Sequence, residues 1–531
     1  MKILSIMVIL FILSSSGFLT AYPGKIITQF AAPGKYGTGL TFDGDNLWLA
    51  DHYQDKLFCI EPQSGKVIKE IAAPGFWPMG LAWDGTYLWN VDAKQKKIFK
   101  IDPSSGIIIE TIDSPSSDPD GLVWDGQTLW MSDHKENTIM KLDLSDGTAL
   151  VKFSGPARSV QGLAFDGNYL WCSDRFLDEI YMLRPEDGEI ILVAPSPGAY
   201  PRGLAFDGTN LWNIDYQSDS LYQLIPRDEE LFRLDRPRKA QITYTHQVKT
   251  SGMGSLLNLD VYFAIPENLP QQKLLHMSFE PTFRDKKKDR WGQEFAHFQY
   301  HDIAAGGWTT TTLVVDAEIS EITYFIYPDR CGNLSDIPSD IRKIYTADGS
   351  KYQIEDPIIQ QIVKKVVGNE KNPYWIARKI FDYVRMNLEY HLEGGWNVAP
   401  FVLQRGTGSC SEYTFSFIAL CRAAGLPARY VGSIVVRGDD ASVDEVFHRW
   451  PEVYLPHYGW IPIDPQGGDK DLPRDRIRNI GHLANRFLIT TQGGGDSEYL
   501  GWYYNSFQKY QTDPQVEVHI EEFGDWQPLN K

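Results

Sequence analysis

One motif recurs five times in the first half of the chain at a constant interval. The segment GLTFDGDNLWLAD begins at Gly39, and its counterparts begin 41 residues apart, at Gly80, Gly121, Gly162 and Gly203. A constant interval without insertions indicates one structural unit that is copied under one geometric constraint. Such a unit buries its apolar face only against its neighbours, so the fold of this region must be an array of stacked units.

Each unit has the pattern of four short strands. A short apolar run precedes an Asp-Gly turn, the LWxxD segment forms a second run, and two more runs follow, such as residues 97–102 and 66–71. Four strands in about 41 residues is the size of one β-propeller blade. The units resemble those of NHL/YVTN-like β-propellers, whose rings often have six or seven blades. The five copies counted in this sequence instead predict an all-β ring of about five blades. Residues 25–30 and 229–234 both look like an outer strand, and either could close the ring.

Three residue types recur at equivalent positions of the units. The repeated tryptophans are expected to pack between blades, and the aspartates before glycine are expected to form turns. The aspartates that end LWxxD could line a metal-binding channel mouth, but hydrogen bonding to nearby backbone is the favoured interpretation. These positions are Trp48, Trp89, Trp130, Trp171 and Trp212; Asp43, Asp84, Asp125, Asp166 and Asp207; and Asp51, Asp92, Asp133, Asp174 and Asp215.

Composition limits the classes of partner. The chain of 531 residues has a net charge of −18, with 43% hydrophobic and 23% charged residues. This is typical of a folded, multidomain protein, and it excludes a nucleic-acid partner because no basic stripe is present. The three lysines at 286–288 are interpreted as a solvated loop.

The N-terminus has the pattern of a signal peptide. Lys2 precedes an apolar run over residues 3–13, three serines follow, and a cleavage site is possible after Ala21. We therefore expect an exported protein, periplasmic or extracellular, with no transmembrane segment in the mature chain. The five cysteines do not form a disulfide framework. We expect them to be mostly buried free thiols, with one exposed.

The sequence divides into a signal peptide (1–21), a propeller (25–237), a β-sandwich (240–345) and an α+β catalytic domain (354–531). The sandwich is predicted from alternating strand patterns after residue 240. Helical periodicity begins near residue 354, and Asn372 followed by Pro373 is typical of a helix N-cap.

Cys410 stands at the start of a predicted helix. A turn with two glycines, residues 406–408, leads into it, and an apolar helical run follows to residue 424. The free N–H groups and the positive dipole end of a helix stabilise an anion, and the thiolate is the nucleophilic form of cysteine. Cys421, in the middle of the same run, is interpreted as a core residue.

A hairpin predicted downstream supplies a base and an orienting group. His448 lies in a strand-like run, Gly459 turns the chain, and a second strand ends at Asp464. His448 and Asp464 can face each other across the two strands, with Cys410 delivered by the helix. His457, nearer the turn, is the weaker candidate base.

The segments GTGSCSEYT, LCRAAGLPARYV and HRWPEVYLPHYGWIPIDP together resemble the transglutaminase-like superfamily over residues 356–491. The resemblance implies a papain-like core with Cys410 as nucleophile, His448 as base and acid, and Asp464 as orienter. For the oxyanion hole it suggests the backbone N–H of Cys410, with Gln404 or Trp396 as side-chain candidates. Arg449 departs from the family, where many members have a small residue, and is expected to point away and change little.

The predicted function is thiol acyl transfer on peptide or side-chain amides of a protein or peptide substrate, with hydrolysis favoured. Two alternatives stay open: a protein-glutamine transglutaminase that forms crosslinks, and a non-catalytic propeller scaffold with a relic papain-like domain. The propeller is expected to be a recognition platform for a protein or carbohydrate. No cofactor or metal is predicted, and calcium dependence is left open.

Overall fold

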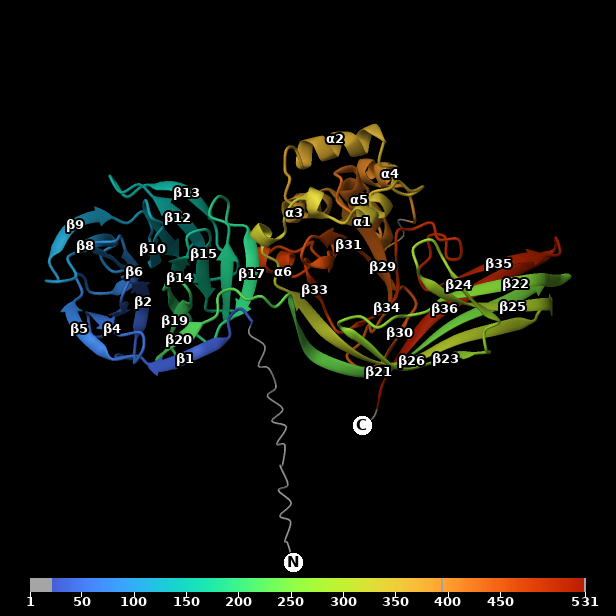
Figure 1. The fold of residues 1–531 in the computed structure, drawn as a ribbon, viewed down its shortest axis with the longest axis horizontal. Helices are drawn as coiled ribbons and strands as arrows, with labels where there is room; N and C mark the ends of the chain where they lie inside the picture. Colours follow the sequence, from blue (N-terminus) through green and yellow to red (C-terminus); the bar gives the residue numbers. More distant parts are fainter. Residues whose placement is uncertain (1–21, 393–394, 530–531) are drawn as a thin grey trace, which may run out of the picture.

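The computed structural model describes residues 22–392 and 395–529. The predicted signal peptide, residues 1–21, lies outside the described residues. Within them the chain forms a β-propeller, a β-sandwich and a core of helices and a small sheet, placed side by side (Figure 1). The mostly β fold class predicted from the sequence is confirmed.

The propeller consists of five antiparallel sheets of four strands each in the described part of the chain. Four blades take their strands in chain order: β2 (Gly37–Phe42), β3 (Leu47–Asp51), β4 (Lys56–Ile60) and β5 (Val67–Ala72); β6 (Pro78–Trp83), β7 (Leu88–Asp92), β8 (Lys97–Ile101) and β9 (Ile108–Asp113); β10 (Pro119–Trp124), β11 (Leu129–Asp133), β12 (Thr138–Leu142) and β13 (Ala149–Ser154); β14 (Val160–Phe165), β15 (Leu170–Asp174), β16 (Glu179–Leu183) and β17 (Ile190–Pro195).

The fifth blade closes the ring with a strand from the beginning of the domain. β18 (Pro201–Phe206), β19 (Leu211–Asp215) and β20 (Ser220–Leu224) are completed by β1 (Ile26–Ala31), which pairs antiparallel with β20. Of the two strand-like segments that could close the ring, the one at residues 25–30 does so. The other, residues 229–234, enters the sandwich instead, because β21 begins at Phe232.

The repeated residues hold each blade together. In every blade the indole N–H donates to the aspartate five residues earlier, over 2.7 Å for Trp48 and Asp43 and 2.9 Å for Trp171 and Asp166. The aspartates that end the second strands accept backbone N–H groups; Asp51, for example, accepts from the N–H groups of residues 53 and 54. The interpretation of these aspartates as backbone acceptors is confirmed.

The sandwich has two sheets, one of six and one of four strands. The large sheet runs β23 (Gln272–Glu280), β26 (Trp308–Tyr324), β21 (Phe232–Gly252), β36 (Val516–Pro528) and β30 (Ser442–Asp444), with β33 (His482–Leu483) beside β26. The small sheet runs β24 (Asp285–Lys288), β25 (Glu294–Ala304), β22 (Ser255–Ala264) and β35 (Ser506–Thr512).

The sandwich therefore differs from the predicted boundaries at both ends. Its first strand begins inside the predicted propeller, at Phe232, and its last two strands, β35 and β36, come from the predicted catalytic domain. β36 fills the place beside β21, which would otherwise be an open sheet edge. The catalytic core is thus inserted between two strands of the sandwich.

The core packs helices on a four-stranded sheet of order β32-β31-β29-β34. Its strands are β29 (Ala428–Val435), β31 (His448–Leu455), β32 (Gly459–Pro462) and β34 (Phe487–Gly493), with a short parallel pair of β27 (Glu389–Tyr390) and β28 (Thr407–Gly408). The helices are α1 (Ser339–Tyr345), α2 (Pro357–Val366), α3 (Pro373–Asn387), α4 (Ala399–Arg405), α5 (Cys410–Ala423) and α6 (Pro473–Ile477), and the 3-10 turns are Pro328–Arg330 and Leu334–Asp336. Asn372 caps α3 as predicted, because its side chain accepts from the N–H groups of Tyr374 and Trp375.

Blade four docks on this core (Figure 1). The guanidinium of Arg474, on α6, donates to both carboxylate oxygens of Glu179 over 2.6 and 2.8 Å, and Arg478 adds a contact of 3.0 Å. Glu179 is buried, so these charge-assisted bonds compensate a carboxylate that has lost its water. The guanidinium of Arg184 also lies 3.7 Å from the ring centre of Trp375 on α3. The propeller is therefore attached by specific contacts as well as by its linker.

Candidate active site

Cys410 is the first residue of α5, the most buried helix of the core. Ser409 is the N-cap, and the carboxylate of Glu412 accepts its backbone N–H over 3.0 Å in a capping box. Glu412 is fully buried, and it also accepts from Arg405 over 2.9 Å and from the side chain of Asn397 over 2.8 Å. Glu412 thus fixes the start of α5 against two neighbouring segments.

Sequence reasoning missed Glu412, although the pattern Ser-x-x-Glu at residues 409–412 is the signature of a capping box.

The sequence-based expectation for the exposure of the thiols was wrong. The cysteines, Cys59, Cys172, Cys331, Cys410 and Cys421, are all unpaired and buried, so the expected exposed thiol is not present. Cys410 is 8% exposed because the start of α5 packs against β31.

His448 begins β31, the strand on which α5 packs. Its Nε2 lies 2.8 Å from Oδ2 of Asp464, and its ring is close enough to the thiol of Cys410 for each group to shift the pKa of the other. Asp464 follows β32, the partner of β31 in the hairpin, and its Oδ1 accepts the N–H groups of Gln466 and Gly467. The structure therefore brings Cys410, His448 and Asp464 together in one chain of interacting side chains.

The charges of these groups are coupled. Burial opposes the imidazolium, but the Asp464 carboxylate and the Cys410 thiol outweigh it and raise the pKa of His448 to about 10. Burial also opposes the thiolate, yet the hydrogen bond and charge of His448, with the charge and backbone N–H of Arg449, lower the pKa of Cys410. The Asp464 carboxyl is partly buried, which opposes its ionisation, and His448 keeps its pKa below the usual value. These shifts favour a thiolate–imidazolium pair.

Arg449 corrects an expectation from the sequence. Its side chain does point away from the His448 face of the strand, but it enters the interior covered by α5 and is completely buried. Four aromatic rings surround the guanidinium, whose carbon lies 4.3 Å from the ring centre of Tyr504, 4.6 Å from Tyr430, 5.1 Å from Phe415 and 5.2 Å from Trp396. Among the described residues it donates to the backbone carbonyl of Trp502 and has no carboxylate partner. Its charge acts on Cys410 and helps to lower the thiol pKa.

The two oxyanion candidates lie in different surroundings. Trp396 packs on the guanidinium of Arg449 and edge-on against Tyr503, with ring centres 4.5 Å apart, so it lies in the layer behind the site. Gln404 lies on the exposed side of α4, and no described hydrogen bond joins it to the site. The backbone N–H of Cys410, at the free end of α5, remains a donor of the right kind.

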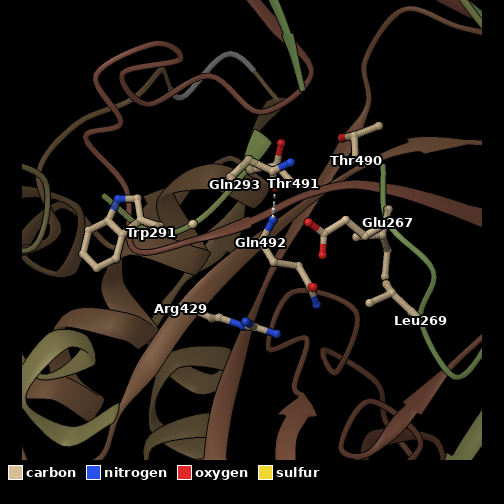
Figure 2. Close-up of a pocket in the computed structure, with 10 residues that line it drawn as sticks. Glu267, Leu269, Trp291, Gln293, Arg429, Thr490, Thr491 and Gln492 are labelled. Carbon is tan, nitrogen blue, oxygen red and sulfur yellow. Dashed lines mark hydrogen bonds between the residues drawn. The ribbon is translucent and has the colours of Figure 1, made fainter. Parts of the chain in front are cut away.

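A cavity of about 110 Å³ lies elsewhere, where the sandwich meets the core sheet (Figure 2). Arg429, Gln492 and Glu267 are among its lining residues, and the N–H of Gln492 donates to Gln293 over 3.3 Å. None of the three residues of the chain Cys410–His448–Asp464 lines it. We therefore regard this cavity as a feature of the domain junction, separate from the candidate active site.

Comparison with known proteins matches the Transglutaminase-like superfamily at residues 360–465. These residues form a transglutaminase-like domain. The match ends one residue after Asp464 and includes Cys410 and His448. The domain supports assignment to a cysteine-type enzyme family, and the repeated four-stranded sheets establish a propeller in front of it.

Two curated relatives are uncharacterised proteins. One, from Haemophilus influenzae, is 28% identical over 221 residues, which are 35% of this chain and 58% of that protein. The other, YebA of Bacillus subtilis, is 26% identical over 145 residues, 23% of this chain and 20% of that protein. The chain thus spans only part of each relative.

Among solved structures, a Cytophaga hutchinsonii protein provisionally named as a cysteine protease is 16% identical with a TM-score of 0.39. It covers 56% of this chain and 100% of its own. Glutaminyl cyclase from Myxococcus xanthus is 15% identical with a TM-score of 0.34, over 38% of this chain and 97% of its own. Among the described residues, no helix has the length and apolar character that crossing a bilayer requires.

Proposed function

We propose that the protein is an exported thiol acyl-transfer enzyme that hydrolyses amide bonds of peptides or of glutamine side chains. The observation that carries the proposal is the chain Cys410–His448–Asp464, in which a thiol at a helix start faces an imidazole held 2.8 Å from a carboxylate. Such a chain supplies a nucleophile, a proton carrier and an orienting group.

The reaction proceeds in two steps. The Cys410 thiolate attacks the amide carbonyl carbon, a C–S bond forms, and the C–N bond breaks as His448 donates its proton to the leaving amine or ammonia. Asp464 keeps His448 oriented and stabilises its charge. In the second step His448 takes a proton from water, the hydroxide attacks the thioester carbonyl, and the acid product leaves as the Cys410 thiolate is restored.

The backbone N–H of Cys410 is the proposed donor to the oxyanion in both steps, because the first N–H groups of a helix have no acceptor within the helix. The complete chain of three residues supports catalysis over a relic domain, since a binding scaffold needs no buried thiolate. Export rests on the N-terminal pattern alone. It predicts that mass spectrometry of protein recovered from the exported fraction finds a new N-terminus after residue 21.

The test of activity supplies a glutamine-containing peptide with excess labelled cadaverine and compares product masses. The proposal expects deamidated or cleaved peptide with wild type and none with Cys410→Ala. If the cadaverine adduct exceeds the hydrolysed product, and both are lost in Cys410→Ala, the enzyme is a transglutaminase and the choice of water as acceptor is wrong. Equal products from wild type and Cys410→Ala would refute an enzymatic role for this thiol.

A further inference from the structure

The five blades are alike along their strands and differ around one end of the ring. Neighbouring blades meet through their first strands, β2, β6, β10, β14 and β18. Three positions at the end where these strands begin change from blade to blade, although the residues around them repeat. They are Thr38, Met79, Asp120, Gln161 and Arg202, before the repeated glycine; Tyr36, Trp77, Asp118, Ser159 and Tyr200, two residues earlier; and His52, Ala93, His134, Arg175 and Tyr216, after LWxxD. We call this end the variable mouth.

A residue that a blade needs in order to fold is repeated in every blade. The variable mouth is therefore free of the constraint that fixes the rest of the repeat, and its composition needs another explanation. In the structure its residues separate into two sectors, one aromatic and one charged.

The aromatic sector spans blades five, one and two. The ring of His52 is stacked on Trp77, with centres 4.9 Å apart, and on Tyr216, with centres 5.9 Å apart. Tyr36 lies between these rings and Tyr53, 5.5 Å from Tyr216 and 5.1 Å from Tyr53. Trp77 is 46% exposed and Tyr53 is 75% exposed, so ring surface faces solvent. Clusters of solvent-facing rings are rare on a surface that binds nothing.

The charged sector spans blades three, four and five. Arg202 donates to Oδ2 of Asp120 over 2.9 Å, and His134 lies 3.4 Å from Asp118 and 3.5 Å from Asp120. Arg175 donates to the hydroxyl of Tyr200, next to the aromatic sector. Arg202 is thus paired with Asp120, whereas Arg175 contacts Tyr200 and no carboxylate among the described residues. The five repeated aspartates that end the second strands lie at the same end of the ring, beside the starts of the first strands, so the mouth disfavours an anionic ligand and suits a neutral one.

Polar atoms at the mouth are left without partners. Asp120 is 1% exposed and Gln161 is completely buried, yet among the described residues Oδ1 of Asp120 and Oε1 of Gln161 accept no hydrogen bond. Nε of Arg202 is also buried and donates to no described acceptor. Buried polar atoms are nearly always hydrogen-bonded, so these acceptors and this donor indicate polar atoms that come from outside the chain.

We propose that the variable mouth binds a carbohydrate, with a neutral sugar ring on the aromatic sector and its hydroxyls at the Asp120–Arg202 pair. A sugar offers an apolar ring face and hydroxyls that both donate and accept, which matches flat rings beside fixed donors and acceptors. A peptide that binds by β-strand addition would need an open sheet edge. The mouth has no such edge, because the first strands of the blades meet each other there.

The test is isothermal titration calorimetry of the full chain carrying Cys410→Ala with cellotetraose, chitotetraose and maltotetraose. This background removes the proposed nucleophile, so the result does not depend on the proposed catalysis. We expect at least one tetrasaccharide to bind. Trp77→Ala and Tyr216→Ala should each weaken it at least tenfold, and Asp120→Asn, which changes shape least, should weaken it measurably.

Trp308→Ala is the matched control, because Trp308 is 69% exposed on the sandwich, away from the ring. It should leave the affinity unchanged, and circular dichroism melts check that every variant is folded. Failure of all three tetrasaccharides to bind would overturn the proposal. So would binding that survives the double variant Trp77→Ala/Tyr216→Ala, or a glutamine-containing octapeptide that binds at the mouth when no sugar does.

Discussion

Replacing His448 by alanine should make the reactivity of Cys410 strongly dependent on pH. The pKa of His448 is raised to about 10, so its positive charge stabilises the folded state. This stabilisation is fully present below the pKa of a free imidazole and is lost as pH rises through 10. The lowered pKa of Cys410 means that the thiolate contribution is present above the pKa of a free thiol and lost as pH falls through the folded value. Between the two folded pKa values the ion pair exists, so labelling of wild type should change less between pH 6 and pH 9 than labelling of the variant.

The expected size of the effect follows from ionisation. A free thiol with a pKa of about 8.5 is ~0.3% ionised at pH 6 and roughly three quarters ionised at pH 9, an increase of roughly 250-fold. Cys410 is only 8% exposed, so burial in His448→Ala should raise its pKa above that of a free thiol. Labelling of the variant should then rise between pH 6 and pH 9 by about 250-fold to about 1,000-fold, the limit of tenfold per pH unit.

The assay is the rate of alkylation by iodoacetamide, measured by peptide mass spectrometry in both proteins. The other thiols should be alkylated slowly, because burial raises the pKa of Cys59 to about 11 and that of Cys331 to about 12. His457→Ala is the matched control, since His457 is exposed near the hairpin turn. A variant that slows labelling equally at pH 6 and pH 9, or a control that behaves like His448→Ala, would refute the ion pair.

Three further predictions test other parts of the structure. Asp464→Asn should lower the pKa of His448 from about 10 toward that of a free imidazole, because the carboxylate charge is its main support; an NMR titration that leaves the pKa unchanged would contradict this. In Arg449→Met, the pH at which Cys410 labelling falls off on the acid side should rise, whereas Arg449→Lys should leave that pH unchanged. The Met variant should change the free energy of unfolding little, because a buried charge without a carboxylate partner is costly to keep. A fragment of residues 22–230 should melt cooperatively and one of residues 32–230 should not, because only the first contains β1; similar melts would show that the ring closes without it.

The parts of the molecule that repeat or that follow a local pattern could be predicted from the sequence. Five copies of one motif at a constant interval define five blades, and the helix start at Cys410 and the hairpin of His448 and Asp464 are visible in a few dozen residues. The strands β35 and β36 could not be assigned, because their partners β22 and β21 lie more than 240 residues away and an isolated strand pattern does not indicate which strand it pairs with.

Arg449 shows a second limit of sequence reasoning. Alternation along β31 does direct its side chain away from His448, as expected. The sequence did not reveal that α5 covers the opposite face of β31. The Arg449 guanidinium is therefore enclosed by aromatic rings, where alternation alone would leave it in solvent. Which face of a core strand meets water depends on the helices packed against it, and that is a property of the tertiary structure.

The insertion of the catalytic core between β26 and β35 has a consequence for cleavage of the chain. Both ends of the core enter the same sandwich, where the 13 residues of β36 pair with β21. A single peptide-bond cut in residues 325–505 would therefore leave two polypeptides that are still held together by a continuous sheet. The protein could be nicked within its catalytic core, or expressed as two separate halves, and still assemble around the sandwich as a non-covalent heterodimer.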